Sequence, residues 1–167
     1  MNIETATRDD LPGIVALETG FPAGERWNDQ LWSDELAAAD RLVLAAHLSD
    51  LDGRSCDLVG AATFQLVGDT ADLHRVVVAE QHRRRGFARV MVVTGLHWAK
   101  GSGASRLLLE VRHDNAAAVA FYSDLGFLVI GERRDYYAAG AHALVMELVL
   151  TGLDLDAVGA WGTEVAQ

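Results

Sequence analysis

The spacing of apolar residues along the chain predicts about seven strands and about four helices. Runs in which apolar residues alternate with polar ones, or follow each other without a break, predict strands at residues 2–7, 41–48, 57–66, 71–78, 107–111, 128–136 and 143–150. Apolar residues on one side of a helical repeat predict a helix that begins at Leu11 and is ended by Gly20, and further helices at residues 29–39, 87–99 and 116–125. Asn28 and Asn115 stand directly before two of these helices, where an asparagine side chain can cap the first turn.

The order of these elements is β-α-α-β-β-β-α-β-α-β-β, which is typical of an α/β (α+β) chain with one mixed sheet and helices on both faces. The run at residues 107–111 is almost entirely apolar, as expected of a strand in the middle of a sheet. We expect one domain at residues 1–150. Residues 151–167 show no clear period, and we expect them to form a peripheral C-terminal tail.

The composition indicates a globular protein and argues against several functional classes. Hydrophobic residues make up 50% of the 167 residues and charged residues 23%, so the chain can bury a core. The single cysteine excludes an internal disulfide, and the formal net charge of −10 argues against a general nucleic-acid binder. No apolar run approaches the ~18–20 residues of a membrane span, and no secretory signal pattern opens the chain. We therefore expect a cytoplasmic protein, either a monomer or a weak dimer.

A cluster of arginines lies between a strand and a helix, at a place suited to anion binding. The chain runs from the apolar residues 76–78 through a polar turn to Arg83, Arg84 and Arg85, and then to Gly86 and a helix. The first turn of a helix has unpaired N–H groups and a positive dipole end, and arginines can pair with phosphate oxygens. Glycine lets the backbone approach a ligand closely. The segment predicts a phosphate site, with an exposed basic helix start as the alternative.

Several motifs of the chain resemble those of the GCN5-related N-acetyltransferases, the GNAT superfamily. The pattern Arg83-x-x-Gly86-x-Ala88 is similar to the loop with which that family cradles the diphosphate of acetyl-CoA. Residues 109–127, which read LEVRHDNAAAVAFYSDLGF, resemble the family's final cofactor-binding motif. Residues 133–137, which read RRDYY, are similar to a stretch of the bacterial ribosomal-protein-alanine N-acetyltransferases of the RimI type. The resemblance implies the GNAT fold, a sheet splayed at an acetyl-CoA site, acetyl-CoA as co-substrate and no metal.

The resemblance also assigns residues to the cofactor. It implies that backbone groups of Val76, Val77 and Val78 hold the pantetheine arm as an added strand would. It implies that the diphosphate lies against the loop and the helix start, which comprise Arg84, Arg85, Gly86, Phe87, Ala88 and Arg89. Asn115 shares a helix face with Tyr122, and we expect it to contact the cofactor, to cap its helix, or to do both.

Glu110 and Tyr122 are the candidate catalytic residues. Glu110 is a lone carboxylate at the end of an apolar strand, which suits a general base, and the resemblance implies that role. The alternative is a glutamate that simply emerges into solvent. Tyr122 could protonate a departing thiolate as a general acid, with a packed tyrosine as the alternative. His74 is a second candidate base, and a packed or solvated strand histidine is its alternative.

Aromatic residues are candidates for the acceptor site. Trp27, Tyr136 and Tyr137 are expected either to line an acceptor groove or to pack in the core. By resemblance, we expect acetyl transfer to a protein N-terminal α-amine, the N-terminal alanine of a small-subunit ribosomal protein. The alternatives are a lysine or small-amine acetyltransferase and a non-catalytic acyl-CoA-sensing module. Asp135 and Ala138 replace the Asn and Pro often seen around the paired tyrosines of the family, which leaves the acceptor open.

Overall fold

The computed structural model describes residues 1–49 and 55–160. Its seven-stranded sheet has the order β1-β2-β3-β4-β5-β7-β6. The strands are β1 (Asn2–Thr5), β2 (Arg41–Ser49), β3 (Ser55–Val67), β4 (Thr70–Val78), β5 (Arg106–Arg112), β6 (Leu128–Ala138) and β7 (Ala141–Val149). The α-helices are α1 (Leu11–Leu17), α2 (Asp29–Ala37), α3 (Phe87–Gly101), α4 (Ala116–Asp124) and α5 (Leu155–Ala160).

The sheet is mixed, as the order of elements predicted. Strands β4 and β5 pair in parallel, whereas β1 with β2, β2 with β3, β5 with β7 and β6 with β7 pair antiparallel. The α/β fold class and the succession of strands and helices are therefore confirmed. The turn expected between β2 and β3 lies largely outside the described residues.

Helix α5 was not predicted. It falls in the segment from residue 151 on, and its Leu155 is only 4% exposed. A helix of 6 residues makes fewer than two turns, so it is too short to produce a recognisable apolar period.

The chain divides into two compact units. Unit 1 comprises residues 1–65 and 75–95, and unit 2 comprises residues 66–74 and those from 96 onward. Strands β3 and β4 and helix α3 each contribute residues to both units.

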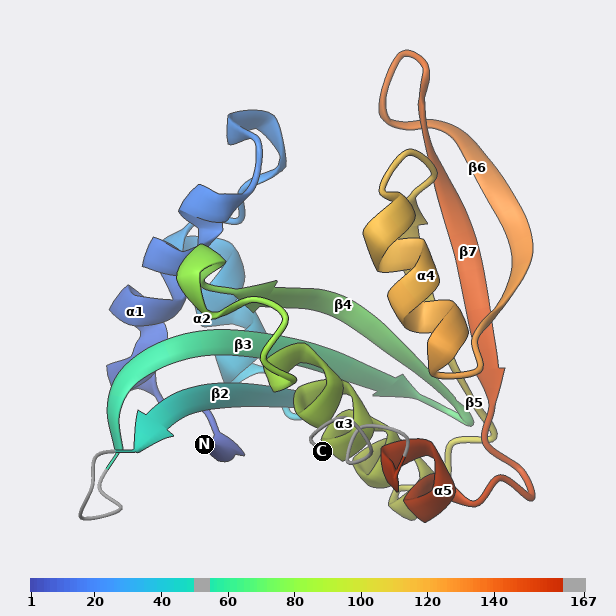
Figure 1. Cartoon of the computed structure of the whole chain (residues 1–167), viewed down its shortest axis with the longest axis horizontal. Helices are drawn as coiled ribbons and strands as arrows, with labels where there is room; N and C mark the ends of the chain where they lie inside the picture. Colours follow the sequence, from blue (N-terminus) through green and yellow to red (C-terminus); the bar gives the residue numbers. More distant parts are fainter. Residues whose placement is uncertain (50–54, 161–167) are drawn as a thin grey trace, which may run out of the picture. The chain divides into compact units, whose positions relative to one another are not determined.

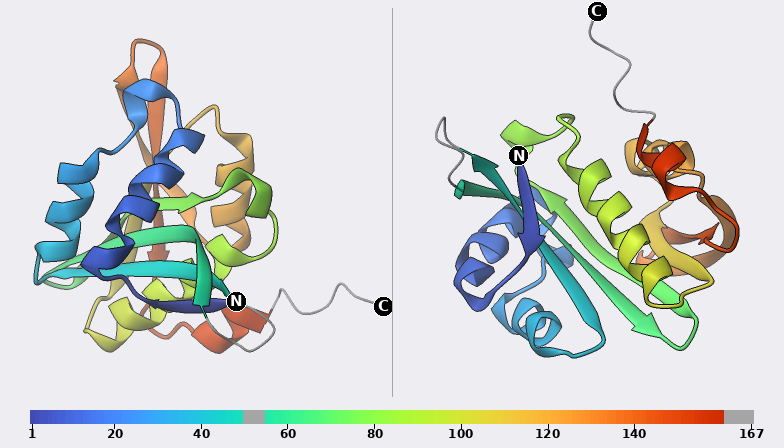
Figure 2. Two further views of the ribbon diagram at one scale, coloured as in Figure 1. Left: turned by 90° about the vertical axis from the view of Figure 1, so that its left-hand side faces the viewer. Right: turned by 90° about the horizontal axis from the view of Figure 1, so that it is seen from below.

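In unit 1, helices cover both faces of the strands (Figure 2). Ile14 of α1 and Trp32 of α2 are fully buried in one cluster with Ala61 of β3. Side chains alternate along a strand, so Phe64 of β3 points to the opposite face, where it packs on α3. A Cβ atom added at Gly95 of α3 would lie 2.1 Å from Cζ of Phe64. The helix can therefore approach this ring only because residue 95 is glycine.

In unit 2, strand β5 has one buried and one half-exposed face. Leu107 and Leu109 are buried, and Glu110 projects from the other, half-exposed face. Helix α4 lies beside β5 and β7 (Figure 1). A Cβ atom added at Gly126, two residues after the end of α4, would lie 3.4 Å from Leu148 of β7, which pairs with Leu107 of β5. The segment that follows α4 therefore packs on the sheet face that carries Leu107 and Leu148.

Candidate active site

Glu110, the candidate base, has two partners on strand β6. Arg133 Nη1 lies 2.9 Å from Glu110 Oε1. The Tyr136 hydroxyl donates a hydrogen bond to the same carboxylate, and this bond, followed by burial, raises the pKa of Tyr136. The side chain of Glu110 is 25% exposed and that of Arg133 is 59% exposed. The candidate base and one of the predicted acceptor-site tyrosines are therefore in direct contact.

The register of three strands explains the contact between Arg133 and Glu110. Glu110 of β5 pairs with Val145 of β7, and Val145 pairs with Gly131 of β6. Arg133 lies two residues beyond Gly131, so the alternation of the strand places both on one face. Strand β7 lies between β5 and β6, so the Arg133 side chain crosses this strand to reach Glu110. The sequence contained this arginine in a motif, but its partner could not be found without the register.

The candidate base stands at the end of a hydrogen-bonded ladder. Pairing between β4 and β5 begins at Thr70 and Arg106 and ends at Leu73 and Leu109. Glu110 is the next residue of β5. Glu110 therefore follows directly on the last residue of β5 that pairs with β4.

A second carboxylate lies near Glu110, on strand β4. Asp72 pairs with Leu108, so Asp72 and Glu110 project from the same face of the sheet. Burial raises the pKa of Asp72, and the charge of Glu110 raises it further, whereas the neighbouring His74 lowers it. His74, the second candidate base, thus lies beside Asp72. One face of unit 2 brings together two carboxylates, a histidine and an arginine.

Tyr122, the candidate acid, is half-buried on α4. Its ring meets that of Phe127 edge-on, with the centroids 5.8 Å apart. Burial raises the pKa of the Tyr122 hydroxyl, and the nearby Tyr137 raises it further. A raised pKa keeps the hydroxyl protonated at neutral pH, as a proton donor requires. The adjacent residues Tyr136 and Tyr137 thus lie near different candidate catalytic side chains, Glu110 and Tyr122 respectively.

The two predicted asparagine caps are confirmed. Asn115 Oδ1 accepts a hydrogen bond of 3.1 Å from the Ala118 N–H at the start of α4. Asn28 Oδ1 accepts one of 2.9 Å from the Leu31 N–H at the start of α2. Since the Asn115 oxygen is used in the cap, its amide NH₂ group is the part suited to donate to a ligand.

The candidate phosphate loop, in unit 1, contains left-handed backbone. Arg84 has a φ of 60° and Gly86 a φ of 86°. For an arginine this conformation costs about 1–2 kcal/mol, and such strain is concentrated at functional sites. Arg84, Arg85 and Gly86 are exposed, and a Cβ atom at Gly86 would meet no atom within 4 Å. Left-handed residues in a turn can direct successive N–H groups into a concave anion site.

Of the other polar side chains of this segment, one is hydrogen-bonded within the protein and two contain a buried nitrogen without a partner among the described residues. Arg83 Nε donates to the Val78 carbonyl oxygen at 3.2 Å, so this arginine holds the loop to the end of β4. Arg89 Nη1 and His82 Nδ1 are buried and have no hydrogen-bond partner in the protein. A buried guanidinium nitrogen without a partner fits a segment that receives an anionic ligand. Phe87 is 4% exposed and anchors the start of α3 in the core.

Trp27 belongs to a buried charged cluster of unit 1 that the sequence did not predict. Glu18 is 2% exposed and accepts hydrogen bonds of 3.1 Å from the Trp32 Nε1–H and from the Trp27 backbone N–H. Arg75 Nε donates to Glu18 Oε1 at 3.1 Å, and Arg75 Nη2 donates to Oε2. The Arg75 guanidinium also lies 3.6 Å above the ring of Phe21. No local pattern marks this cluster, because its members come from separate segments.

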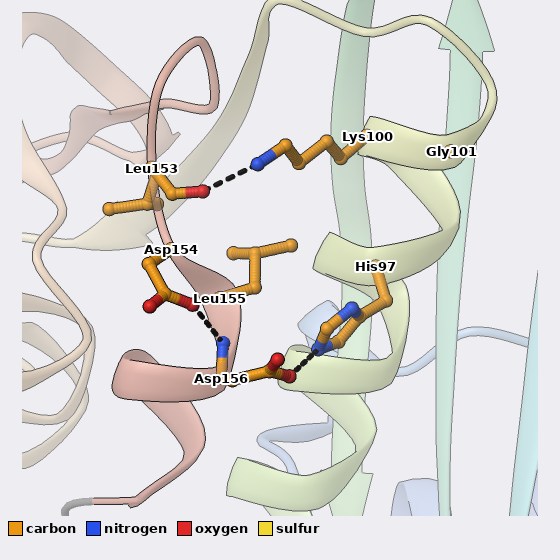
Figure 3. A pocket seen from close by; sticks show the side chains of 7 residues that line it. All are labelled: His97, Lys100, Gly101, Leu153, Asp154, Leu155 and Asp156. Atoms are coloured by element: carbon orange, nitrogen blue, oxygen red, sulfur yellow. Dashed lines mark hydrogen bonds and ion pairs between the residues drawn. The ribbon is translucent and has the colours of Figure 1, made fainter.

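A pocket of about 370 Å³ in unit 2 contains none of the candidate residues. It lies between the C-terminal part of α3 and the start of α5 (Figure 3). Its lining consists of His97, Lys100, Gly101, Leu153, Asp154, Leu155 and Asp156. Lys100 donates to the Leu153 carbonyl, and His97 lies 3.9 Å from Asp156. The polar groups of this pocket are thus engaged with one another.

Neither a metal-binding cluster nor a membrane-spanning helix occurs among the described residues. Within residues 1–49 and 55–160, no group of three or more His, Cys, Asp or Glu side chains is placed to hold a metal ion. Nor is any helix in these ranges long and apolar enough to span a membrane.

Comparisons with known proteins agree with the motifs. The sequence matches the Acetyltransferase (GNAT) family over residues 11–127. The ribosomal protein bS18-alanine N-acetyltransferase of Escherichia coli is 38% identical over 135 residues, which are 81% of this chain and 86% of the relative. The crystal structure of the Escherichia coli ribosomal-protein-alanine N-acetyltransferase superposes with a TM-score of 0.76 at 27% identity, covering 89% of this chain and 93% of that one.

Other relatives are longer than this chain. An uncharacterized protein of Mycobacterium leprae is 35% identical over 150 residues, which are 86% of this chain and 39% of the relative. The chain spans 30% of the length of an N-acetyltransferase of Bacillus subtilis. The resemblance to ribosomal-protein-alanine N-acetyltransferases, first seen in the motifs, is confirmed as a similarity over most of the chain. With more than half of its residues matched, the chain belongs to the Acetyltransferase (GNAT) family.

Proposed function

We propose that this chain is an acetyl-CoA-dependent N-acetyltransferase that acts on a protein N-terminal α-amine. By analogy with its relatives, the acceptor is the N-terminal alanine of a small-subunit ribosomal protein. The observation that carries the proposal is the position of Glu110, a solvent-reachable carboxylate one residue beyond the β4–β5 ladder. The helix that follows β5 supplies Tyr122, a hydroxyl with a raised pKa.

In this proposal, the end of β4, the loop before α3 and Asn115 hold the co-substrate. Backbone groups of Val76, Val77 and Val78 hold the pantetheine arm, and Val77 can offer only backbone because its side chain is 2% exposed. The diphosphate lies against the loop and the start of α3, which comprise Arg84, Arg85, Gly86, Phe87, Ala88 and Arg89. The left-handed backbone at residues 84 and 86 and the unpartnered Arg89 nitrogen support this assignment. The free amide NH₂ of Asn115 is a further donor toward the cofactor.

The proposed reaction is a direct transfer. Acetyl-CoA supplies an activated acetyl group as a thioester. Glu110 takes a proton from the acceptor ammonium through a water molecule, and the neutral amine attacks the carbonyl carbon. As the new C–N bond forms and the C–S bond breaks, Tyr122 gives its hydroxyl proton to the departing sulfur. The nitrogen loses its second proton, which returns through solvent to the Tyr122 phenolate. Glu110 then releases the first proton to solvent, so the reaction releases one proton overall.

Tyr136 is the aromatic residue best placed for a role on the acceptor side. It is 49% exposed and contacts Glu110 directly. Trp27 is half-buried and packs 5.2 Å from the ring of Trp32. Tyr137 lies near Tyr122. We therefore propose that Tyr136 contacts the acceptor, while Trp27 and Tyr137 contribute through the residues that they support.

The first test measures CoA release from acetyl-CoA with short peptides that differ in their first residue, alongside free lysine and polyamines. Turnover on peptides that begin with alanine, lost when their N-terminus is blocked, is the expected result. Turnover only on side-chain or small amines would retain acetyl transfer and reject the N-terminal acceptor. Tight CoA binding without turnover on any amine would point instead to an acyl-CoA-sensing module.

A second test concerns the catalytic side chains. Glu110→Gln and Tyr122→Phe should each lower kcat by about 10²–10⁴-fold while CoA affinity is retained. Glu132 is an exposed glutamate of strand β6, so Glu132→Gln makes the same chemical change and should leave kcat unaltered. Full activity of Glu110→Gln and Tyr122→Phe would reject the assignment of both residues.

A further inference from the structure

We propose that Arg133 is the resident counter-ion of Glu110 and that the cationic amine of an acceptor replaces its guanidinium on the carboxylate. This inference rests on the proposed function, because it names the group that the acceptor must displace. It makes Arg133 a specificity-determining residue. The site then selects acceptors that carry a positive charge on the group that meets Glu110.

Two of the positions around the Glu110 carboxylate at which an incoming ammonium could bind are already occupied. Arg133 Nη1 already lies 2.9 Å from Glu110 Oε1, and the Tyr136 hydroxyl occupies another acceptor position of the carboxylate. An ammonium that bound Glu110 beside Arg133 would bring two like charges to within a few ångströms. Exchange of one cation for the other avoids this repulsion and preserves the charge balance at Glu110.

Arg133 is placed so that it can leave. Its side chain is 59% exposed, against 25% for Glu110, so it reaches the carboxylate from the solvent side. Ion pairs with an exposed partner are weak, so breaking this one costs little free energy. The Arg133 Cζ atom lies 5.6 Å from the centroid of the Tyr136 ring. A cation–π contact with this ring can hold the guanidinium after it leaves Glu110.

The surroundings of Glu110 favour a cation once Arg133 has moved. Asp72 projects from the same face, and the charge of Glu110 raises its pKa, so the two carboxylates interact. His74 and Arg106 are the other charged or titratable groups that act on Asp72 besides Arg133. Without a guanidinium at Glu110, two acidic side chains meet on this face, which attracts a positive group and disfavours a neutral one.

The test measures the binding of a small cationic amine. Alaninamide is titrated into the ¹⁵N-labelled full chain, its Arg133→Gln variant and its Arg134→Gln variant, and the dissociation constant is taken from NMR shifts. Arg134 is the next residue and is also exposed, so its variant makes the same charge change as a matched control. Thermal unfolding of all three chains verifies that each is folded.

The expected result is a dissociation constant lowered by about 1.5- to 5-fold in Arg133→Gln alone, because no resident cation competes there. The neutral N-acetylalaninamide should show no such gain. Equal or weaker alaninamide binding in Arg133→Gln would overturn the proposal. An equal gain in alaninamide affinity in Arg133→Gln and Arg134→Gln would also overturn it, because such a gain would be a general effect of net charge.

Kinetics give a second readout. In Arg133→Gln the KM for the acceptor should fall by the same factor, with kcat within about twofold and the KM for acetyl-CoA unchanged. Millimolar guanidinium chloride should compete with the acceptor more strongly in this variant than in the native chain. A raised acceptor KM would show that Arg133 binds the acceptor and would overturn the exchange. If the native chain acetylates no amine, the proposed function fails, and alaninamide binding still decides the role of Arg133.

Discussion

Arg75 donates two hydrogen bonds to the carboxylate of Glu18, although the two residues lie 57 positions apart in the chain. The Glu18 side chain is 2% exposed and that of Arg75 is 13% exposed. Trp32 Nε1–H and the Trp27 backbone N–H complete the bonding of the carboxylate. A buried charge is tolerated when it is paired and hydrogen-bonded in this way. The pair therefore ties strand β4 to the segment between α1 and α2.

Substitution of Glu18 by glutamine should destabilise the chain strongly. The variant leaves the Arg75 guanidinium buried without a counter-charge, which costs about 3–5 kcal/mol. Glu147→Gln removes the partner of Arg106, whose side chain is 47% exposed, and should cost no more than about 1 kcal/mol. Urea unfolding of both variants measures the difference. Equal losses would mean that the buried pair contributes no more than a surface pair.

Gly95→Ala should disturb the packing of α3 on unit 1. The new Cβ atom would lie 2.1 Å from Cζ of Phe64, so the ring or the helix must shift, at a cost of about 1–3 kcal/mol. Gly101→Ala, at the end of the same helix, is the control, because a Cβ atom there meets nothing within 4 Å. Thermal unfolding should show a lower Tm for the first variant alone. An unchanged Tm for Gly95→Ala would contradict the packing described for Phe64.

Asp72→Asn should stabilise the folded chain at neutral pH. Burial raises the pKa of Asp72 above 3.8, so its ionisation opposes folding, and this penalty is present above the raised pKa. The advantage of the variant should therefore disappear as the pH falls below about 4, where the carboxyl is protonated in both states. Urea unfolding between pH 3 and pH 7 measures this dependence.

Asp69→Asn should show the opposite dependence. Hydrogen bonds from Ser105 and Thr70 lower the pKa of Asp69, so its ionised form stabilises the folded state above pH 3.8. The variant should be less stable than the native chain at pH 7, and the difference should vanish as the pH falls through the lowered pKa. The same sign for Asp69→Asn and Asp72→Asn would contradict the environments assigned to the two residues.

Arg84→Glu should weaken CoA binding by about tenfold or more, because it replaces a charge-assisted contact to phosphate by repulsion. Arg134→Glu makes the same charge reversal on β6 and should change the affinity far less. Calorimetric titration with CoA measures both, and the loss should shrink at 1 M salt because Arg84 is exposed. If CoA and the acceptor lost affinity equally in Arg84→Glu, the loop would not be specific for the cofactor.

Local signals in the sequence were sufficient for the order of the predicted elements, although most of their ends differ from the observed ones by one or two residues. Asn28 and Asn115 cap their helices through bonds to residues three positions ahead, Leu31 and Ala118, so the information lies within one turn. The apolar runs that predicted the strands, and the glycine that follows the arginine cluster, are also signals carried by a few neighbouring residues. The order of elements and the family resemblance followed from such patterns. The short α5 did not, because fewer than two turns produce no period.

The partners of the candidate base depend on the tertiary structure. Strand β7 lies between β5 and β6, and the register across it places Arg133 and Glu110 on one face of the sheet. The pairing of Arg75 with Glu18 likewise depends on which segments the core of unit 1 brings together. The apolar period of an element and its caps are decided by residues within a few positions of each other, so they could be predicted from local sequence. Strand order and register are decided by the packing of the whole sheet, so only the tertiary structure determined which charges meet.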